Sequence, residues 1–484
     1  MVALLSIFLL IPLIYGAVNP GVRFTLDQAA IENFKNDYIQ SYIKKCASYS
    51  VKQHLVTTSV FTYNVTNLHF SSFTLKPSNT QIVLNPKTNT INLAITNLSF
   101  VMNGNLTFWL LASSKGTVEI SLTNGNFTIP LAVTVNSDGT LSAAVQTITG
   151  TLSAIKLKVH ARNPIYKMMQ LVGDIWPFKT NIASNFFSTM GQYLSPAIKT
   201  ILAKISYVDS LNGANMTADY HFLNFGVSSS YIEGDLNGTC YLGPYIEPPY
   251  YATSPPSFQT TNTLKVQYSE YFFDTYIWGL QQSGQLNLYI PSAKAPSSLP
   301  FKMTTTGLAS ILPNIAKVYG QNIPIDTSCQ VYNPPNIFMT DEVYITAPVY
   351  CDFLAMQSST SHPAAFRLQF QLNSVLTATL NEEKTGLYLI PNVDSSSTTI
   401  TNIVAQNSNI GIINISRVQM ALNWCIYSIA TYLNEQLTLS GGFKLPVPAG
   451  VTFTDEQIVA YPGAVEISGT PHFDMIVDEI VRNH

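Results

Sequence analysis

The sequence predicts an α+β protein made of two halves that repeat one order of elements. Each half combines long stretches of alternating apolar and polar residues with helix-type apolar stripes, and a proline-rich segment separates the halves. Of the 484 residues, 46% are hydrophobic and 11% are aromatic, which is enough apolar surface to offset the entropy of ordering and excludes a disordered chain. The net charge of −3 argues against a nucleic-acid-binding protein.

The chain is expected to begin with a signal peptide at residues 1–17. Its apolar run at 2–15 is shorter than the roughly 20 residues that span a bilayer, and Gly16 and Ala17 provide small residues for cleavage. A buried N-terminal strand is the alternative, since no basic residue precedes the run. Because residues 242–259 hold five prolines, we expect three further segments: an N-terminal domain at 18–235, a linker at 236–262 and a C-terminal domain at 263–484.

In the first half, the pattern predicts a helix at 26–45 with Thr25 as its N-cap, strands at 59–159 and a second helical region at 164–205. The dipeptides Asn-Gly at 103–104 and 124–125, and Asp-Gly at 138–139, predict hairpin turns. Apolar stripes at helical spacing mark the two helices: Ile31, Phe34, Tyr38 and Tyr42 on the first, and Phe186, Met190, Tyr193 and Ile201 on the second.

The second half is predicted to contain a helix at 305–319, strands, and a long helix at 416–437. Its apolar stripes are Leu308, Ile311, Leu312 and Ile315 on the first helix, and Leu422, Ile429 and Leu433 on the second. The halves differ in charge, since residues 17–235 carry 15 Lys and Arg against 10 Asp and Glu, and residues 236–484 carry 9 against 17. No residue-level similarity between the halves accompanies the shared order of elements.

Glycosylation sequons, together with the signal peptide, indicate an exported protein, and the five cysteines are too few for a disulfide scaffold. Cys329 and Cys351 flank a predicted hairpin near Thr340 and would face each other across it, whereas Cys46 and Cys240 could pair or stay free. Cys425 lies on the last predicted helix and is expected to be a buried apolar residue. Seven N-x-Ser/Thr sequons are expected to carry glycans: Asn64, Asn97, Asn105, Asn126, Asn215, Asn237 and Asn414.

No residue pattern indicates catalysis or metal binding. The nucleophile elbow, the H-E-x-x-H zinc pattern, the P-loop and the dinucleotide-binding glycine run are all absent, and no two histidines stand at metal-ligand spacing. The sequence therefore nominates no enzyme, cofactor or metal. Two readings of the apolar stripes stay open: each helix closes a solid core against its sheet, or it leaves an apolar cavity that takes up lipid.

Several segments resemble one family, in the same order along nearly the whole mature chain. This is the family of bactericidal/permeability-increasing protein, lipopolysaccharide-binding protein and the lipid transfer proteins, the lipid-binding serum glycoproteins. Residues 19–25 (NPGVRFT) resemble its mature start, and residues 268–275 (YSEYFFDT) resemble the opening strand of its second domain. Further matches are Ile311-Leu312-Pro313, Asn409-Ile410-Gly411 and the run FKLPVP at 443–448.

The resemblance implies an elongated boomerang of two pseudo-repeated domains joined by a central β-sheet. Each domain would be a highly twisted antiparallel β-barrel with long amphipathic helices, and an apolar tunnel between them would hold a phospholipid. The apolar stripes named above thereby become the expected lipid-binding residues. The disulfide that bactericidal and lipopolysaccharide-binding members carry in their first domain has no counterpart, because residues 147–160 and 186–205 contain no cysteine.

The resemblance also places a membrane-contacting hairpin at 99–115. Where the bactericidal and lipopolysaccharide-binding members carry many lysines, this hairpin has one lysine and the apolar run that includes Phe108, Trp109 and Leu110, with Lys44, Lys45 and Lys52 expected nearby. Such an aromatic tip suits insertion into a lipid surface, and a buried strand is the alternative.

The sequence therefore predicts a secreted, monomeric lipid-binding or lipid-transfer protein. Its expected partners are a phospholipid or other acyl lipid and the surface of a membrane or lipid particle. The alternative is an innate-immune lipopolysaccharide-binding antibacterial protein, for which the positive first half offers some support. A structural extracellular glycoprotein is a further alternative.

Overall fold

The fold is taken from a computed structural model of the 484-residue chain. The structure describes residues 19–36, 50–57, 62–109, 113–152, 154–160, 195, 198–199, 202, 206–211, 215–243, 245–260, 263–358, 361–383, 386–439, 443–444 and 452–472. The predicted signal peptide lies outside these residues.

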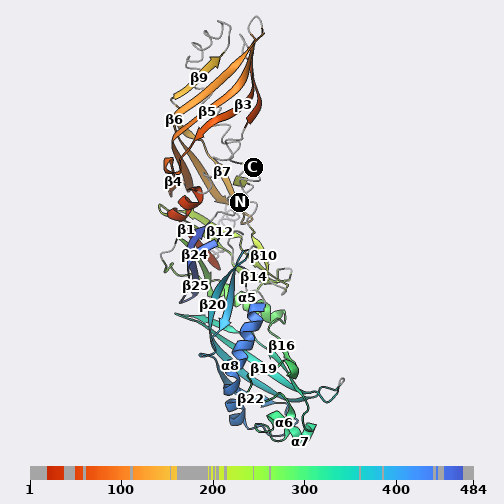
Figure 1. Ribbon diagram of the computed structural model, residues 1–484. Helices are drawn as coiled ribbons and strands as arrows, with labels where there is room; N and C mark the ends of the chain where they lie inside the picture. The colour runs from red at the N-terminus through yellow and green to blue at the C-terminus, as the bar shows by residue number, and fades with distance from the viewer. Residues whose placement is uncertain are drawn as a thin grey trace, which may run out of the picture.

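A six-stranded antiparallel sheet lies at the centre of the elongated molecule, in the order β12-β13-β1-β15-β25-β24 (Figure 1). Three strands come from each half: β1 (Val22–Asp27), β12 (Phe222–Val227) and β13 (Tyr231–Leu236), then β15 (Leu264–Ser269), β24 (Thr452–Tyr461) and β25 (Ala464–His472). The opening strands of the two halves, β1 and β15, pair in the middle, with Phe24 opposite Val266. The halves therefore repeat one order of strands around this pair.

The N-terminal lobe is a curled antiparallel sheet at one end of the molecule (Figure 1). Its strands are β2 (Ser50–Thr57), β3 (Thr62–Thr74), β4 (Thr80–Asn85), β5 (Thr90–Trp109), β6 (Ser113–Val135), β7 (Leu141–Val145), β8 (Thr149–Thr151) and β9 (Ala154–His160), with the 3-10 turn η2 at Pro77–Asn79. The long strands β5 and β6 extend to the outer end of the lobe, and β3 and β9 flank them.

The C-terminal lobe is a second antiparallel sheet at the opposite end (Figure 1). Its strands are β16 (Leu288–Ile290), β17 (Ile325–Val331), β18 (Asn336–Met339), β19 (Val343–Ala355), β20 (Ala364–Glu383), β21 (Gly386–Val393), β22 (Thr399–Gln406) and β23 (Phe443–Lys444), with the 3-10 turn η3 at Ser292–Lys294. A small fourth sheet joins β10 (Val208–Leu211), β11 (Met216–Asp219) and β14 (Thr239–Leu242).

Helices are few in the described part of the chain. Residues 28–36 form a helix directly after β1, and α5 (Glu270–Gln282) directly follows β15, so each half opens with a strand and a helix. The C-terminal lobe adds α6 (Thr305–Leu308), α7 (Ile315–Tyr319) and α8 (Ile415–Leu439), which contacts β21 and β22. None of the described helices is both long enough and apolar enough to cross a bilayer.

The three largest apolar clusters of the described residues form most of the core. The central cluster spans both halves, because Phe222 and Phe225 of the first half pack together with Tyr268, Phe272 and Ile467 of the second. A second cluster fills the outer end of the C-terminal lobe, and a third lies against β5 and β6 of the N-terminal lobe. The predicted fold class is confirmed: an α+β molecule of two similar lobes joined by a central sheet.

The prediction for the start of the first helix was wrong. Residues 22–27 alternate apolar and polar side chains and form β1, so Thr25 lies inside a strand and caps no helix. The helix begins after Asp27, whose Oδ1 accepts a hydrogen bond from the backbone N of Ala30 at 2.9 Å. A carboxylate at this position satisfies one of the open N–H groups of the first turn.

Two predicted hairpin turns lie inside strands. Asn103 and Gly104 belong to β5, and Asn124 and Gly125 lie in β6 beside an irregularity in its pairing with β5. Asn124 has a φ of 57°, a conformation that asparagine tolerates better than most residues and that bulges use. The predicted turn at Asp138-Gly139 is confirmed, since it links β6 to β7 with a φ of 79° at Gly139.

Two element predictions in the second half also require correction. Pro313 separates α6 from α7, so the predicted helix at 305–319 is two short helices. The expected strand at 268–275 ends at Ser269, whose side chain accepts a hydrogen bond from the backbone N of Phe272 and starts α5. The long helix predicted at 416–437 is confirmed as α8. The predicted helix at 164–205 falls mostly outside the described residues. The residues of this range that are described, 195, 198–199 and 202, are helical.

The predicted domain division stays a prediction. Within the predicted linker, residues 239–242 form β14, and residues 247–260 form neither helix nor strand. This extended segment lies against the central sheet, because the backbone N atoms of Gln259 and Thr260 donate to the Glu466 carboxylate at 2.7 and 2.8 Å.

Candidate functional site

The helix α8 is held on the C-terminal lobe by small side chains and by amide groups. Buried residues along one side are Val418, Ala421, Cys425 and Ser428, and Ala430 is buried farther round the helix. Near its start, Gln419 Nε2 donates to the carbonyl oxygen of Ile400 on β22 at 2.9 Å. Near its end, Asn434 exchanges two hydrogen bonds with the backbone of Val393 on β21, at 2.7 and 3.0 Å. These contacts fix the position of α8 on the sheet.

One flank of α8 carries large apolar side chains that are only half-buried. Leu422, Ile429 and Leu433 recur at spacings of seven and four residues, so they lie along one side of the helix. Leu422 also packs against the apolar cluster at the outer end of the lobe. The structure thus places three of the predicted lipid-binding residues together, on the border between the sheet-facing side of α8 and solvent.

The other predicted residues of the C-terminal lobe lie in a closed core. Leu308, Leu312 and Ile315 are buried among residues of β17 and β20, including Ile325 and Phe366, and Ile311 packs partly against the same cluster. The side chains of Leu308, Leu312 and Ile315 are therefore enclosed by protein, whereas Ile311 is half-buried, as the residues of the α8 flank are.

In the N-terminal half, few of the predicted lipid-binding residues are described. Ile31 is part of the central core and Phe34 is half-buried. Tyr38, Tyr42, Phe186, Met190, Tyr193 and Ile201 lie outside the described residues.

The sheet of the N-terminal lobe offers apolar residues that the sequence analysis did not name. Phe70, Phe73, Met102 and Ile120 are partly buried against a cluster centred on Leu98, Phe100 and Leu122 of β5 and β6. Alternation of apolar and polar residues along these strands is the signal that could have identified them.

The predicted tip hairpin is present, with β5 and β6 paired up to Trp109 opposite Ser113. The Trp109 side chain is 40% exposed at this end of the lobe. The side chains of Phe108 and Lys52, and residues Leu110, Lys44 and Lys45, lie outside what the structure describes.

A second exposed apolar surface lies on the outer side of α8. Met420, Trp424 and Tyr427 are 49%, 59% and 68% exposed and lie on the side of the helix opposite Val418 and Cys425. This stripe was not among the predicted residues, because the prediction for α8 rested on its buried face. The signal was an aromatic pair three residues apart on the other face.

The seven sequons differ in how their side chains are engaged. Asn97, Asn105, Asn126, Asn215 and Asn414 are exposed, and Asn64 is half-buried. Asn237 is also half-buried; its Nδ2, the atom that a glycan would modify, donates to Asp219 Oδ2 at 2.7 Å, and its Oδ1 accepts from Thr239. A glycan at Asn237 would replace one of the two Nδ2 hydrogens, which face Asp219 and the hydroxyl of Tyr241.

The structure joins Cys329 and Cys351 in a disulfide across β17 and β19. Cys240 and Cys425 are free and buried, and burial raises the pKa of the Cys240 thiol to about 12. Cys46 lies outside the described residues. Within the described ranges, no three His, Cys, Asp or Glu residues gather as metal ligands would.

Comparisons with known proteins agree with the fold. A family model for the C-terminal domain of the LBP / BPI / CETP family matches residues 247–470. The chain is 24% identical to bactericidal permeability-increasing protein of Sebastes schlegelii, over 76% of this chain and 78% of that protein. It is 22% identical to phospholipid transfer protein of Mus musculus, over 99% and 96%. The crystal structure of lipopolysaccharide binding protein superposes with a TM-score of 0.58 at 13% identity, over 94% of this chain and 100% of that one.

The two lobes and the shared central sheet define the class as a two-lobed α+β fold, which the crystal structure of lipopolysaccharide binding protein also has. Residues 247–470 match the C-terminal domain of the LBP / BPI / CETP family, which confirms the resemblance found in the sequence.

Proposed function

We propose that the chain is a secreted, glycosylated, monomeric protein that binds acyl lipids and carries them between lipid surfaces. The observation that carries this proposal is the half-buried Leu422-Ile429-Leu433 flank of α8, on a fold shared with a family of lipid carriers. Transfer of this kind needs no catalytic group, because burying each methylene of an acyl chain releases about 0.8 kcal/mol.

Lipid content of the purified protein is the first test. We expect organic extraction and native mass spectrometry of protein secreted from cells to recover phospholipid. Folded protein without any bound acyl lipid, and unable to take up phosphatidylcholine from vesicles, would contradict the proposal.

A pair of variants on α8 tests the flank itself. Ile429→Gln places an amide where acyl chains would pack, and we expect transfer of fluorescent phosphatidylcholine between vesicles to fall about fivefold, because a buried unpaired amide costs about 1–3 kcal/mol. The control is Thr431→Gln, an exposed position on the other side of the same helix. Equal transfer rates for the two variants would exclude the flank as a lipid contact.

We further propose that Trp109 and the stripe Met420-Trp424-Tyr427 contact the lipid surface. Tryptophan and tyrosine favour the membrane–water interface, and Arg417 is the one charged side chain of α8 before Glu435. We expect Trp109→Ser and Trp424→Ser each to weaken co-sedimentation with phosphatidylcholine vesicles severalfold. Tyr251→Ser, at a linker position 93% exposed, is the control; an equal loss in the control would contradict this assignment.

Binding of lipopolysaccharide is the second candidate function, supported by the excess of five basic over acidic residues in 17–235 and by the similarity to lipopolysaccharide-binding protein. An electrostatic clamp predicts binding to lipid A micelles that weakens between 0.05 and 0.5 M salt, that is, as the screening length falls below about 10 Å. If the protein binds phosphatidylcholine but shows no salt-sensitive binding of lipid A, the lipid-transfer function is favoured over lipopolysaccharide binding.

A further inference from the structure

The central sheet carries a polar cleft of about 520 Å³ over β13, β1 and β15. Strand pairing puts Glu233, Thr25 and Lys265 in one row across the three strands, and Tyr231 lies opposite Asp27 in the adjacent row. Because side chains alternate between the faces of a strand, this row lies on the face opposite Phe24 and Leu26, which pack against the central core.

One wall of the cleft is the extended segment that contains Ser257 and Phe258. The fully buried Glu466 carboxylate holds this segment, because it accepts hydrogen bonds from the backbone N atoms of Gln259 and Thr260 and from the hydroxyl of Tyr461. A buried carboxylate with several donors is a strong anchor, so the shape of the cleft is fixed by the fold.

The charged groups around the cleft fall into two sets. Arg23 is paired with Asp235 at 2.8 Å, and Asp27 caps the helix that follows it. Within the described part of the chain, Lys265 and Glu233 have no ion-pair partner; the Lys265 ammonium lies 5.6 Å from the centre of the Phe258 ring. The two unpaired side chains have opposite charges.

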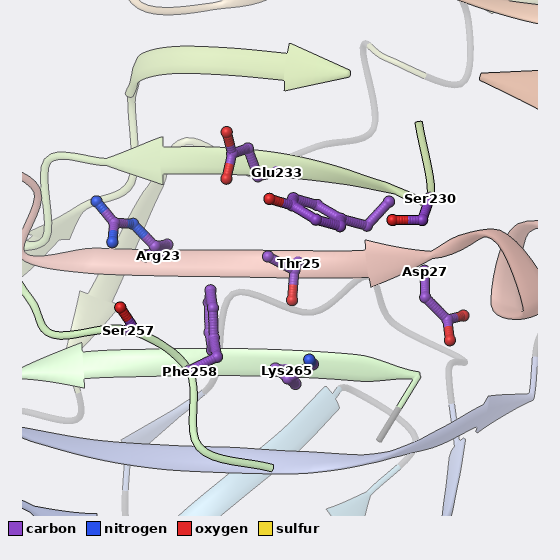
Figure 2. A pocket seen from close by; sticks show the side chains of 9 residues that line it. Arg23, Thr25, Asp27, Ser230, Glu233, Ser257, Phe258 and Lys265 are labelled. Atoms are coloured by element: carbon purple, nitrogen blue, oxygen red, sulfur yellow. The ribbon is translucent and has the colours of Figure 1, made fainter. Parts of the chain in front are cut away.

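Between these charges lies a hydroxyl without a partner. Thr25 is 5% exposed, and its Oγ1 is buried without a hydrogen bond to any described group. In Figure 2, Thr25 lies on β1 between Glu233 on one side and Lys265 on the other, with Arg23 and Asp27 farther along the strand. A buried hydroxyl that lacks a protein partner costs free energy, and a ligand in the cleft would satisfy it.

We propose that the cleft binds a small zwitterion that carries a phosphate and an ammonium group, as phosphocholine and phosphoethanolamine do. The phosphate accepts hydrogen bonds from the Lys265 ammonium and the Thr25 hydroxyl. The ammonium lies against the Glu233 carboxylate and the ring of Tyr231, which attracts cations through its π face. Two strand spacings separate Glu233 from Lys265, about 10 Å at the backbone, so a single small ion could not serve both.

This site goes beyond the proposed function, because it lies on the polar face of the sheet and has no place for acyl chains. Its ligand could be a free phospho-ammonium compound or the headgroup of a phospholipid. The two sources share one chemistry, and the experiment separates them.

Titration calorimetry of the full chain with phosphocholine, choline and inorganic phosphate tests the proposal. We expect phosphocholine to bind at least about tenfold more tightly than either fragment, a difference of about 1.4 kcal/mol, because each fragment lacks one of the two charged groups. In Lys265→Gln, phosphocholine should bind no more tightly than choline. In Glu233→Gln, phosphocholine should bind no more tightly than phosphate. Lys156→Gln, an exposed lysine on β9, is the matched control and should bind as the unaltered chain does.

Vesicles of phosphatidylcholine distinguish the sources of the ligand. If a lipid headgroup occupies the cleft, Lys265→Gln and Glu233→Gln weaken vesicle binding, and soluble phosphocholine competes with the vesicles. If a free compound occupies the cleft, the two substitutions leave vesicle binding unchanged. Either pattern, together with the calorimetry, supports the site. Absence of phosphocholine binding at about 10 mM would overturn the proposed site. It would also be overturned if both variants, with native circular dichroism, bound phosphocholine as tightly as the unaltered chain does. That failure would leave acyl-chain binding untouched.

Discussion

The N-terminal lobe extends its two longest strands, β5 and β6, to the end of the molecule, whereas the C-terminal lobe ends in the short helices α6 and α7 (Figure 1). The C-terminal lobe has a disulfide between β17 and β19, and its helix α8 is bound by amide groups to two strands. Among the described residues of the N-terminal lobe there is no disulfide. Yet each lobe contributes three strands to one central sheet.

This difference suggests that the two lobes share the central sheet and that each lobe is otherwise stabilised by its own contacts. Disruption at the centre should therefore affect both lobes, and disruption in one lobe should leave the other intact. The following predictions test that separation in order of expected effect.

The largest effect is expected from Phe272→Ala. Phe272 is fully buried where α5 meets the central sheet, and its ring centre lies 4.9 Å from that of Tyr268. Removing a buried phenylalanine ring costs about 3–5 kcal/mol, so calorimetry should show both lobes unfolding at lower temperature. Phe338→Ala, at an exposed position of β18, is the control. If only one lobe were destabilised, the shared core would not couple them.

Removal of the disulfide should act on one lobe. Cys329 and Cys351 are 22 residues apart, and a cross-link of that separation stabilises by about 3 kcal/mol. We expect the double variant Cys329→Ala/Cys351→Ala to lower the unfolding temperature of the C-terminal lobe, with the exchange protection of β5 and β6 amides unchanged. Loss of protection in both lobes would contradict the separation.

A smaller effect is expected from a carboxyl at the junction. Burial, with the charge of Glu270 adding to it, raises the pKa of Asp274 from 3.8 to about 7. Because the folded state holds this proton more tightly than the unfolded state, the contribution to stability is complete below about pH 4 and is lost as the pH rises through 7.

Asp274→Asn should therefore raise the unfolding temperature at pH 8 and flatten its dependence on pH between 5 and 8. We expect the free energy of unfolding at pH 8 to rise by about 1 kcal/mol, a value reduced for solvent screening at this partly exposed site. The control is Glu435→Gln on the exposed side of α8. If the unfolding temperature depends on pH equally in the unaltered chain and in the Asp274 variant, this carboxyl is not the source of the pH dependence.

Glycan occupancy should differ between two sequons, with little effect on stability. Asn414 is exposed and its Oδ1 accepts from the backbone N of Arg417, which leaves Nδ2 accessible, whereas Nδ2 of Asn237 is bound to Asp219. Peptide mass spectrometry after enzymatic deglycosylation should find Asn414 occupied and Asn237 largely unmodified. A fully occupied Asn237 would show that modification precedes this local packing.

The elements that sequence patterns predicted well are long and regular. The helix α8 was located to within two residues because its apolar stripe repeats without proline or glycine over 25 residues. The start of the first helix was misplaced because residues 22–27 fit a strand whose partners, β13 and β15, are more than 200 residues away. Asn-Gly at 103–104 was misread because a local turn signal cannot show that a strand continues through it.

The candidate sites show the same limit. The flank residues of α8 could be predicted, because helical spacing alone places them together. The row of Glu233, Thr25 and Lys265 could not, because only the register of three strands from both halves brings these residues side by side.

The pairing of β1 with β15 also has a consequence for biosynthesis. Strand β15 hydrogen-bonds on its other side to β25, and Leu264 there lies opposite Gly469, about 200 residues later in the sequence. The sheet therefore cannot close until β25 has left the ribosome, and before that it presents an open edge to which other strands can add. Newly made chains should accordingly depend on chaperones until their last strands arrive.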